Sequence, residues 1–99
     1  DVWMMPVTPM TPRKIGYYDM SLDVDTYNKT VMGPDCVFTA PFNATGLPAI
    51  SLPLHFTNKD LPVGIQFVGR EADDKTLIRL SSQLEKKLPW KDKKPPLVL

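Results

Sequence analysis

The chain has 99 residues, a formal net charge of +1 and a hydrophobic share of 42%, which bound it to one small domain of ordinary globular composition. The small charge gives no support to a nucleic-acid or anionic-lipid partner, and no apolar run approaches the ~20 residues of a membrane-spanning helix. We therefore expect neither a nucleic-acid partner nor a membrane partner. The single cysteine, Cys36, cannot form an internal disulfide, which favours a reducing compartment such as the cytoplasm.

Eleven prolines divide the chain into short elements. Proline fixes φ and lacks an N–H donor, so long regular elements are expected only in the interval 63–88. The apolar run Val2–Met5, which ends at Pro6, predicts a buried strand, and a loop rich in proline and threonine follows over residues 6–12. Because this run begins at the first residues, we expect the chain to be cut out of something longer. Residues 15–29 combine tyrosines with aspartates, which predicts a surface segment with one short helical turn.

A short helix is predicted over the mostly apolar residues 37–45. Pro41 fits the first turn of that helix, where its missing N–H leaves no hydrogen bond unmade. Gly46 and Pro48 follow in the arrangement that closes a helix, with glycine at the C′ position and proline just beyond it.

Two strands joined by a polar turn are predicted next. Residues 49–54 form the first strand, which should end at its own proline, and residues 63–68 form the second. The polar segment 56–61 between them favours an antiparallel hairpin. Gly64 inside the second strand allows a bulge or the close approach of neighbouring atoms. Gln66 lies among apolar neighbours and needs hydrogen-bond partners if it is buried.

The clearest helix is predicted over residues 73–88. Asp73 suits its N-cap, and Pro89 stops it. Leucines recur at three- and four-residue spacing and make one apolar stripe, formed by Leu77, Leu80, Leu84 and Leu88. Residues 91–99 follow as an extended tail that is basic and rich in proline. The elements together indicate an α/β chain in a single piece, 1–99, with a few strands and one long C-terminal helix.

No residue of the chain offers an activated nucleophile. Ser51 lies in a predicted strand, whereas Ser81 and Ser82 lie on the predicted helix beside lysines that should be solvated. No glycine-rich loop lies beside these serines to bind an oxyanion. His55 is the lone histidine and Cys36 the lone cysteine, and neither a metal-ligand spacing nor a nucleotide-binding loop is visible. We therefore assign no catalytic residue, no metal and no cofactor to this chain.

Several blocks of the sequence occur in a fixed order. An apolar run with a proline-threonine loop comes first, followed by phenylalanine-threonine, an N-x-x-G-x-P motif, LPVGIQFVG, and a leucine-rich helix with an acidic start and a closing proline-tryptophan. These blocks are Asp1–Pro9, Phe38–Thr39, Asn43–Pro48, Leu61–Gly69 and Asp73–Trp90. In this order the chain resembles the C-terminal segment of the amidase signature family. Asp60 departs from the family pattern, in which a glycine is usual at that position.

The resemblance implies a fold, an activity and a substrate-binding region. The fold is the C-terminal fragment of the amidase signature fold, a large mixed sheet flanked by helices, and the partner of this chain is then the remainder of the amidase domain. The activity is hydrolysis of the carboxamide C–N bond of a small molecule by a Ser-Ser-Lys triad that lies upstream, so this chain alone should be inactive. The resemblance also implies which residues line the substrate pocket: Thr8, Thr39, Phe42 and Asn43.

Alternatives remain at the level of residues and of function. Phe42 has core packing as an equal alternative, and Asn43 has the alternative of bracing the turn at Gly46. The A-type component of a tRNA-dependent glutamyl or aspartyl amidotransferase shares the same blocks, although PFNATGLP is closer to the general amidases. A further alternative is a non-catalytic interaction module that binds through its basic tail and open sheet edges. For the free chain, we expect self-association through those edges.

Overall fold

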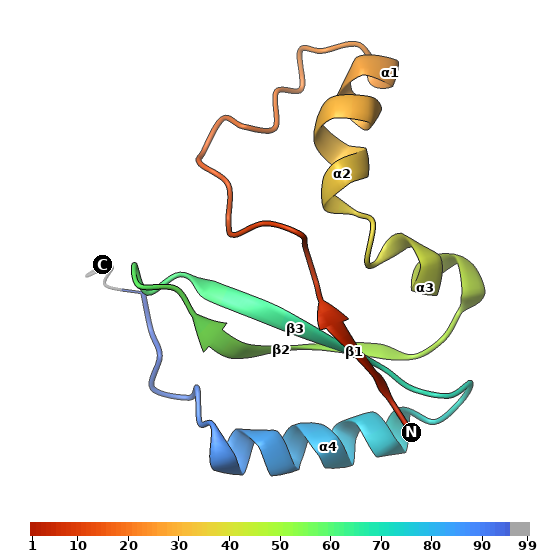
Figure 1. The fold of residues 1–99 in the computed structure, drawn as a ribbon, viewed down its shortest axis with the longest axis vertical. Coiled ribbons are helices and arrows are strands. Elements are labelled where there is room, and N and C mark those ends of the chain that lie inside the picture. Colours follow the sequence, from red (N-terminus) through yellow and green to blue (C-terminus); the bar gives the residue numbers. More distant parts are fainter. Residues whose placement is uncertain (96–99) are drawn as a thin grey trace.

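A computed structural model describes residues 1–95 of the chain, and it has one antiparallel sheet with helices on both sides (Figure 1). The sheet has three strands in the order β1-β3-β2. Helix α4 lies on one side of the sheet, and α1 to α3 lie on the other (Figure 1). The predicted α/β class is confirmed. In chain order the elements are β1 (Trp3–Pro6), α1 (Val24–Tyr27), the π-helix η1 (Asn28–Met32), α2 (Gly33–Asp35), α3 (Ala40–Thr45), β2 (Ala49–Phe56), β3 (Pro62–Val68) and α4 (Asp74–Lys87).

The predicted hairpin is confirmed, and β1 joins its second strand from the other edge. β2 pairs antiparallel with β3 from Ala49↔Val68 onward, and β1 pairs antiparallel with β3 from Trp3↔Val68 onward. The polar turn of the hairpin is held by Thr57, whose hydroxyl accepts the backbone N–H of Leu61 at 3.1 Å. Asp60 in this turn has a φ of 55°, a left-handed conformation that favours glycine, which gives a physical reason for the glycine of the family pattern.

Strand β2 does not end at Pro53, as the sequence predicted, but continues to Phe56. Proline is tolerated here because β2 is an edge strand and its pairing with β3 is interrupted by a bulge between Leu52 and His55. Gly64 lies opposite the bulge. A Cβ atom on Gly64 would lie 2.8 Å from the Ser51 hydroxyl oxygen, so the predicted close approach is confirmed.

The hydrophobic core lies between the sheet and α4. Leu52 of β2, Phe67 of β3 and Leu77 of α4 form its buried centre. Asp73 caps the helix as predicted, since its side chain accepts the backbone N–H of Thr76. Leu88 is an exception to the predicted stripe, because the helix ends at Lys87 and this side chain is 51% exposed. Partly buried apolar side chains surround the centre: Val2, Ile50, Leu54, Ile65, Leu80, Leu84 and Trp90.

The segment before α3 is more helical than the sequence predicted. In place of one short turn, α1, η1 and α2 follow one another without a break over residues 24–35. The widened turn of η1 has the N–H of Gly33 donating to the carbonyl of Asn28, five residues back. Pro34, which cannot donate a backbone hydrogen bond, directly follows this widened turn. Burial of Val31 then secures the segment by tertiary packing, which local sequence does not reveal.

Helix α3 has the boundaries of a short helix that glycine closes. It is shorter than predicted, and Pro41 lies in its first turn. Gly46 closes it with a φ of 72° and donates its N–H to the carbonyl of Phe42, as the sequence predicted. Phe42 is the buried residue of this helix.

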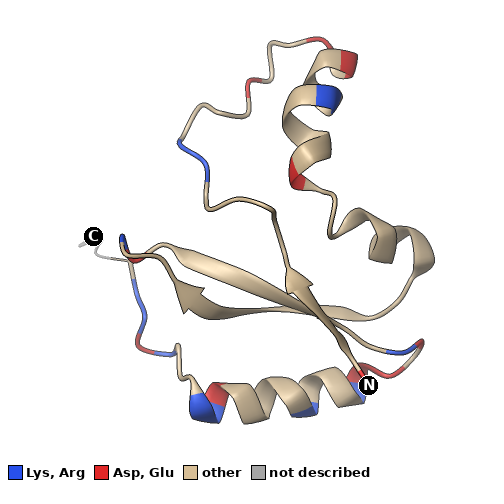
Figure 2. Ribbon diagram, in the orientation of Figure 1, with Lys and Arg blue, Asp and Glu red and all other residues tan. Residues whose placement is uncertain are grey.

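Charged side chains avoid the sheet and gather on the helices and loops (Figure 2). Of the predicted tail, residues 91–95 are described and 96–99 lie outside the described residues. The start of the tail turns back, because the Lys93 ammonium lies 5.3 Å from the centroid of the Phe56 ring. Within residues 1–95, none of the helices has the length and hydropathy needed to cross a membrane.

Candidate functional site

A cavity of about 220 Å³ lies between the loop that follows β1 and the first residues of β3. Thr8 and Met10 line it from the loop, and Gly64 lines it from the strand. Three polar side chains complete its wall: Arg13, Tyr18 and Asp35. The cavity thus joins segments that are far apart in sequence, and it combines polar groups with apolar surface.

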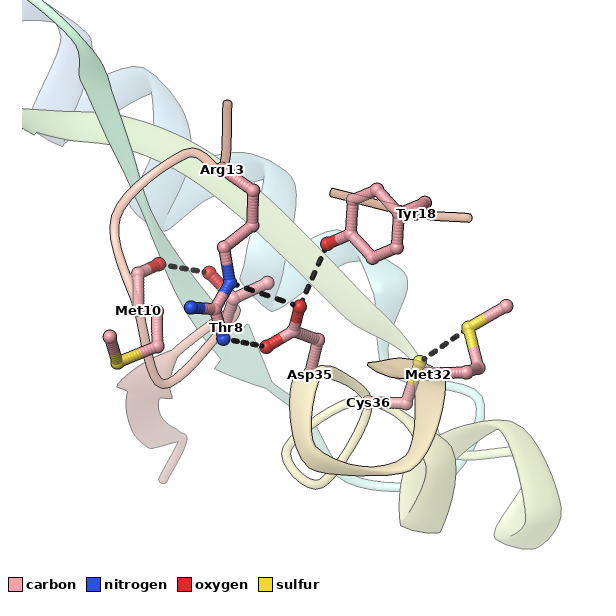
Figure 3. A network of polar contacts seen from close by, with 7 residues as sticks. All are labelled: Thr8, Met10, Arg13, Tyr18, Met32, Asp35 and Cys36. Carbon is pink, nitrogen blue, oxygen red and sulfur yellow. Dashed lines mark hydrogen bonds and ion pairs between the residues drawn. The ribbon is translucent and has the colours of Figure 1, made fainter. Parts of the chain in front are cut away.

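The polar side chains form one network around the Asp35 carboxylate (Figure 3). Arg13 donates from Nη2 to Oδ1 at 2.9 Å and from Nε to Oδ2 at 3.4 Å. The Tyr18 hydroxyl donates to Oδ2 at 2.8 Å. The Asp35 side chain is only 8% exposed, whereas that of Arg13 is 23% exposed. A buried carboxylate with charge-assisted partners is a stable arrangement, because both oxygens are satisfied.

The network changes the titration of its members. Hydrogen bonds from Arg13 and then from Tyr18 lower the pKa of Asp35, although burial opposes the shift. The hydrogen bond to Asp35, together with burial, raises the pKa of Tyr18. The hydrogen bond to Asp35 likewise raises the pKa of Arg13. At neutral pH the carboxylate is therefore ionised, the guanidinium is charged and the phenol is neutral.

Local structure places each member of the network. Asp35 lies at the end of α2, directly after the widened turn of η1. The guanidinium of Arg13 lies 4.4 Å from the centroid of the Tyr17 ring, a cation–π contact. Tyr17 in turn packs edge-on against Tyr18, with ring centroids 5.3 Å apart. The loop is thus attached to α2 by both polar and aromatic contacts.

Sequence reasoning missed this network. One signal was present, because Asp35 is the sole charged residue between Lys29 and Lys59. An isolated carboxylate in a long uncharged stretch is a candidate for burial with a partner. The identity of that partner depends on how the loop returns to α2, and the spacing of Arg13 does not reveal it.

The predicted pocket residues do not all meet in this cavity. Thr8 lines it, and its hydroxyl donates to the carbonyl of Met10 at 2.8 Å. Thr39 precedes α3 and is half-buried, with its hydroxyl 3.4 Å from the carbonyl of Cys36. Phe42 and Asn43 lie on α3, and neither they nor Thr39 line the cavity.

The two residues with alternative roles differ in their surroundings. Phe42 is buried, and its ring packs edge-on against Trp3 with centroids 6.1 Å apart. Asn43 is exposed, and within residues 1–95 its side chain makes no hydrogen bond. The end of α3 is instead braced by Thr45, whose hydroxyl donates to the carbonyl of Pro41 at 2.9 Å.

A second, larger hollow of about 340 Å³ lies at the start of β1. Trp3, Leu47 and Val68 supply apolar surface to it. Its charged groups are Asp1 and Arg70, an exposed pair with 3.2 Å between Oδ1 and Nη2. This hollow has no buried polar group comparable to Asp35, and we therefore place the candidate site at the first cavity.

Metal-ligating residues are scattered in this fold. Residues 1–95 contain no group of three or more His, Cys, Asp or Glu side chains that could hold a metal ion. His55 is exposed on β2. Cys36 is a free cysteine whose thiol donates to the Met32 sulfur at 3.5 Å.

Comparisons with known proteins agree with the arrangement of these elements. The chain is 38% identical over 98 residues to the A-type component of the glutamyl-tRNA(Gln) amidotransferase of Brevibacillus brevis, matching 99% of this chain and 19% of that protein. It is 41% identical over 61 residues to the 6-aminohexanoate-cyclic-dimer hydrolase of a Pseudomonas species, matching 62% of this chain and 12% of that protein.

A solved structure is similar over nearly the whole chain. It is that of a 6-aminohexanoate cyclic dimer hydrolase complexed with substrate, with a TM-score of 0.81 and 29% identity over 91% of this chain. The chain spans about a fifth of the length of that hydrolase, 20%, and of the first curated relative, 19%. The sequence model of the family described as Amidase matches residues 1–78. The chain therefore belongs to the amidase family.

Proposed function

We propose that this chain is the C-terminal part of an amidase that hydrolyses the carboxamide C–N bond of a small molecule. The main support is the agreement of the sequence match over residues 1–78 with the structural similarity at a TM-score of 0.81. The triad of the proposed mechanism, Ser-Ser-Lys, belongs to the part of the protein upstream of Asp1. A serine nucleophile of this kind needs a deprotonated lysine nearby and donors for the oxyanion.

In this proposal the chain contributes part of the wall of the substrate pocket. Thr8, Thr39, Phe42 and Asn43 remain the proposed substrate-binding residues. All belong to the loop after β1 or to the segment around α3, on the side of the sheet opposite α4 (Figure 1). Since α4 covers the other side with the hydrophobic core, the side of α3 is the one that remains available to a substrate.

The remainder of the amidase domain is the proposed partner. Trp3 and Met4 of the edge strand β1 are 65% and 70% exposed, and an exposed apolar edge strand favours further pairing or packing. The chain spans about a fifth of its relatives, 19% in the first case, so a large body of protein would cover this edge. We expect the isolated chain to self-associate at the same edge.

Sedimentation of the isolated chain tests this proposed docking. Concentration-dependent association supports it, and a Trp3→Ser, Met4→Ser variant should be less associated than the wild type. A matched change at Ile78, which is exposed on α4, should leave association unchanged. A stable monomer at all concentrations would instead favour the non-catalytic interaction module. The free thiol of Cys36 is the reason for proposing a cytoplasmic location.

Hydrolysis of simple carboxamides by the full-length protein tests the activity. We expect ammonia release from small amides and labelling of an upstream serine by a fluorophosphonate probe. The isolated chain should give neither result, because it carries no activated nucleophile. A full-length protein without hydrolysis and without labelling would contradict the proposal.

A second candidate function is that of the A-type component of a tRNA-dependent amidotransferase. The 38% identity to such a protein over 98 residues favours it. This function requires further protein components and transfer of ammonia from glutamine to a tRNA-bound acyl group. Co-purification with tRNA and with a second protein component, together with amide transfer to the charged tRNA, would favour it over the simple amidase.

A further inference from the structure

We infer that Arg13, held as a neutral pair with Asp35, makes the cavity beside Thr8 selective for uncharged amide substrates over anionic ones. This inference rests on the proposed amidase function and names the substrate class that the site favours. Arg13 is then a specificity-determining residue, and Asp35 is the positioning residue that neutralises it.

One end of the guanidinium is available to a ligand. Nη2 and Nε donate to Asp35, whereas Nη1 makes no hydrogen bond within residues 1–95. Figure 3 shows this nitrogen turned away from Asp35, toward the side of Met10. Arg13 lines the cavity and is partly exposed. Its free N–H groups therefore suit a carbonyl oxygen, which accepts hydrogen bonds without carrying a charge.

The charge balance of the cavity excludes a strong preference for ions. Arg13 and Asp35 are the charged residues of its lining, and they are paired at 2.9 Å. The strands near it carry no Lys, Arg, Asp or Glu (Figure 2). A substrate carboxylate would meet the guanidinium and the carboxylate together, so the attraction to one is largely cancelled by the other. A neutral substrate loses nothing from this cancellation.

The size and surface of the cavity fit a small acyl group. Its volume is about 220 Å³, which is smaller than a typical drug-sized site of ~300–1,000 Å³. Met10 and Val63 offer apolar surface beside the polar groups. A carboxamide or acyl carbonyl with a short aliphatic chain satisfies both kinds of surface.

The test compares two substrates in the full-length protein. Butanamide is neutral, and succinamate has a carboxylate in place of its terminal methyl group. In the wild type we expect the larger kcat/KM for butanamide. Asp35→Asn keeps the shape of the side chain but leaves Arg13 unneutralised, so the ratio of kcat/KM for succinamate over butanamide should rise by about tenfold, the order expected for one unit charge a few ångströms away.

The reverse substitution gives the opposite sign. Arg13→Met leaves the Asp35 carboxylate alone in the wall, so the same ratio should fall below that of the wild type. Asp1→Asn is the matched control, because it also removes a carboxylate paired with an arginine, Arg70, at an exposed position. That variant should keep the wild-type ratio.

The ratio separates specificity from folding. A variant that folds poorly loses activity toward both substrates equally, since both report on the same folded molecules. An unchanged ratio in Asp35→Asn and Arg13→Met, in an enzyme that hydrolyses butanamide, would overturn this inference and leave the amidase function standing. A wild type that hydrolyses no carboxamide would overturn the amidase function first, and the inference with it.

Discussion

The side-chain amide of Gln66 donates to the backbone carbonyl of Phe38 at 2.9 Å and so ties the middle of the sheet to the segment before α3. Gln66 is 6% exposed and pairs with Met5 of β1 and Ser51 of β2. This contact fixes α3, which carries two of the proposed substrate-binding residues, relative to the strands. A buried glutamine in an apolar strand thus acts as a polar anchor.

Replacing Gln66 by methionine should destabilise the fold. Methionine has a similar length but leaves the Phe38 carbonyl without its partner, at a cost of about 1–3 kcal/mol. Urea unfolding of the full-length protein measures the change. Gln83→Met is the matched control, because Gln83 is exposed on α4, and it should shift the unfolding midpoint little. Equal effects of the two substitutions would show that the hydrogen bond is unimportant.

Leu77 and Ile78 are neighbours on α4 with opposite environments. Leu77 is 3% exposed and contacts the core, whereas Ile78 is 64% exposed. Leu77→Ala should lower the free energy of unfolding by about 3 kcal/mol, because it removes buried methyl groups and leaves a cavity. Ile78→Ala should change it by less than about 0.5 kcal/mol. Urea unfolding of both variants checks the difference, and a similar loss in each would contradict the placement of the core.

The sequence predicted those parts of the fold whose causes are local. The leucine stripe, Asp73 at the N-cap and Gly46 at the end of α3 each act within one or two turns of helix. The antiparallel hairpin followed from strand-like runs on both sides of a polar turn. In each case the residues that decide the structure lie within a few positions of the structure they decide.

The parts that the sequence did not predict depend on distant contacts. β2 continues past Pro53 because its pairing partner and edge position tolerate a bulge. The helix over residues 24–35 depends on burial of Val31, and the Arg13–Asp35 pair joins residues that are 22 positions apart. Of the predicted pocket residues, Thr8 lines the cavity with that pair, whereas Thr39, Phe42 and Asn43 lie elsewhere.

Gly33 should resist replacement by alanine. At an ordinary helix position this change stabilises by roughly 0.5–1 kcal/mol. Here the added Cβ would lie 2.4 Å from the backbone carbonyl oxygen of Asn28, which cannot move without opening the widened turn. We therefore expect Gly33→Ala to destabilise by about 1–3 kcal/mol.

Urea unfolding of the Gly33→Ala variant measures the sign of the change. Ser82→Ala, at an exposed position of α4, is the control for an alanine that meets no obstacle. A stabilised Gly33→Ala variant would mean that the widened turn relaxes to a regular α-helix at no cost.

The Arg13–Asp35–Tyr18 network should make stability depend on pH at both extremes. The pKa of Asp35 is lowered from 3.8 by its partners, so its contribution is fully present above pH 3.8 and is lost as pH falls through the lower folded-state pKa. The pKa of Tyr18 is raised from 10.0, so its contribution is present below pH 10.0 and is lost as pH rises through the higher folded-state pKa.

Unfolding of the full-length protein over a series of pH values tests both limbs. The difference in stability between wild type and Asp35→Asn should be constant near neutral pH and should shrink in acid, where the carboxylate of the wild type becomes protonated. The difference between wild type and Tyr18→Phe should shrink in alkali for the same reason. Asp25→Asn removes an equal charge from an exposed position in α1 and should leave the acid limb in place. If the difference for Asp35→Asn were the same at every pH, the carboxylate would not be the group that the network stabilises in its ionised form, because a group with equal pKa in the folded and unfolded states adds no pH dependence.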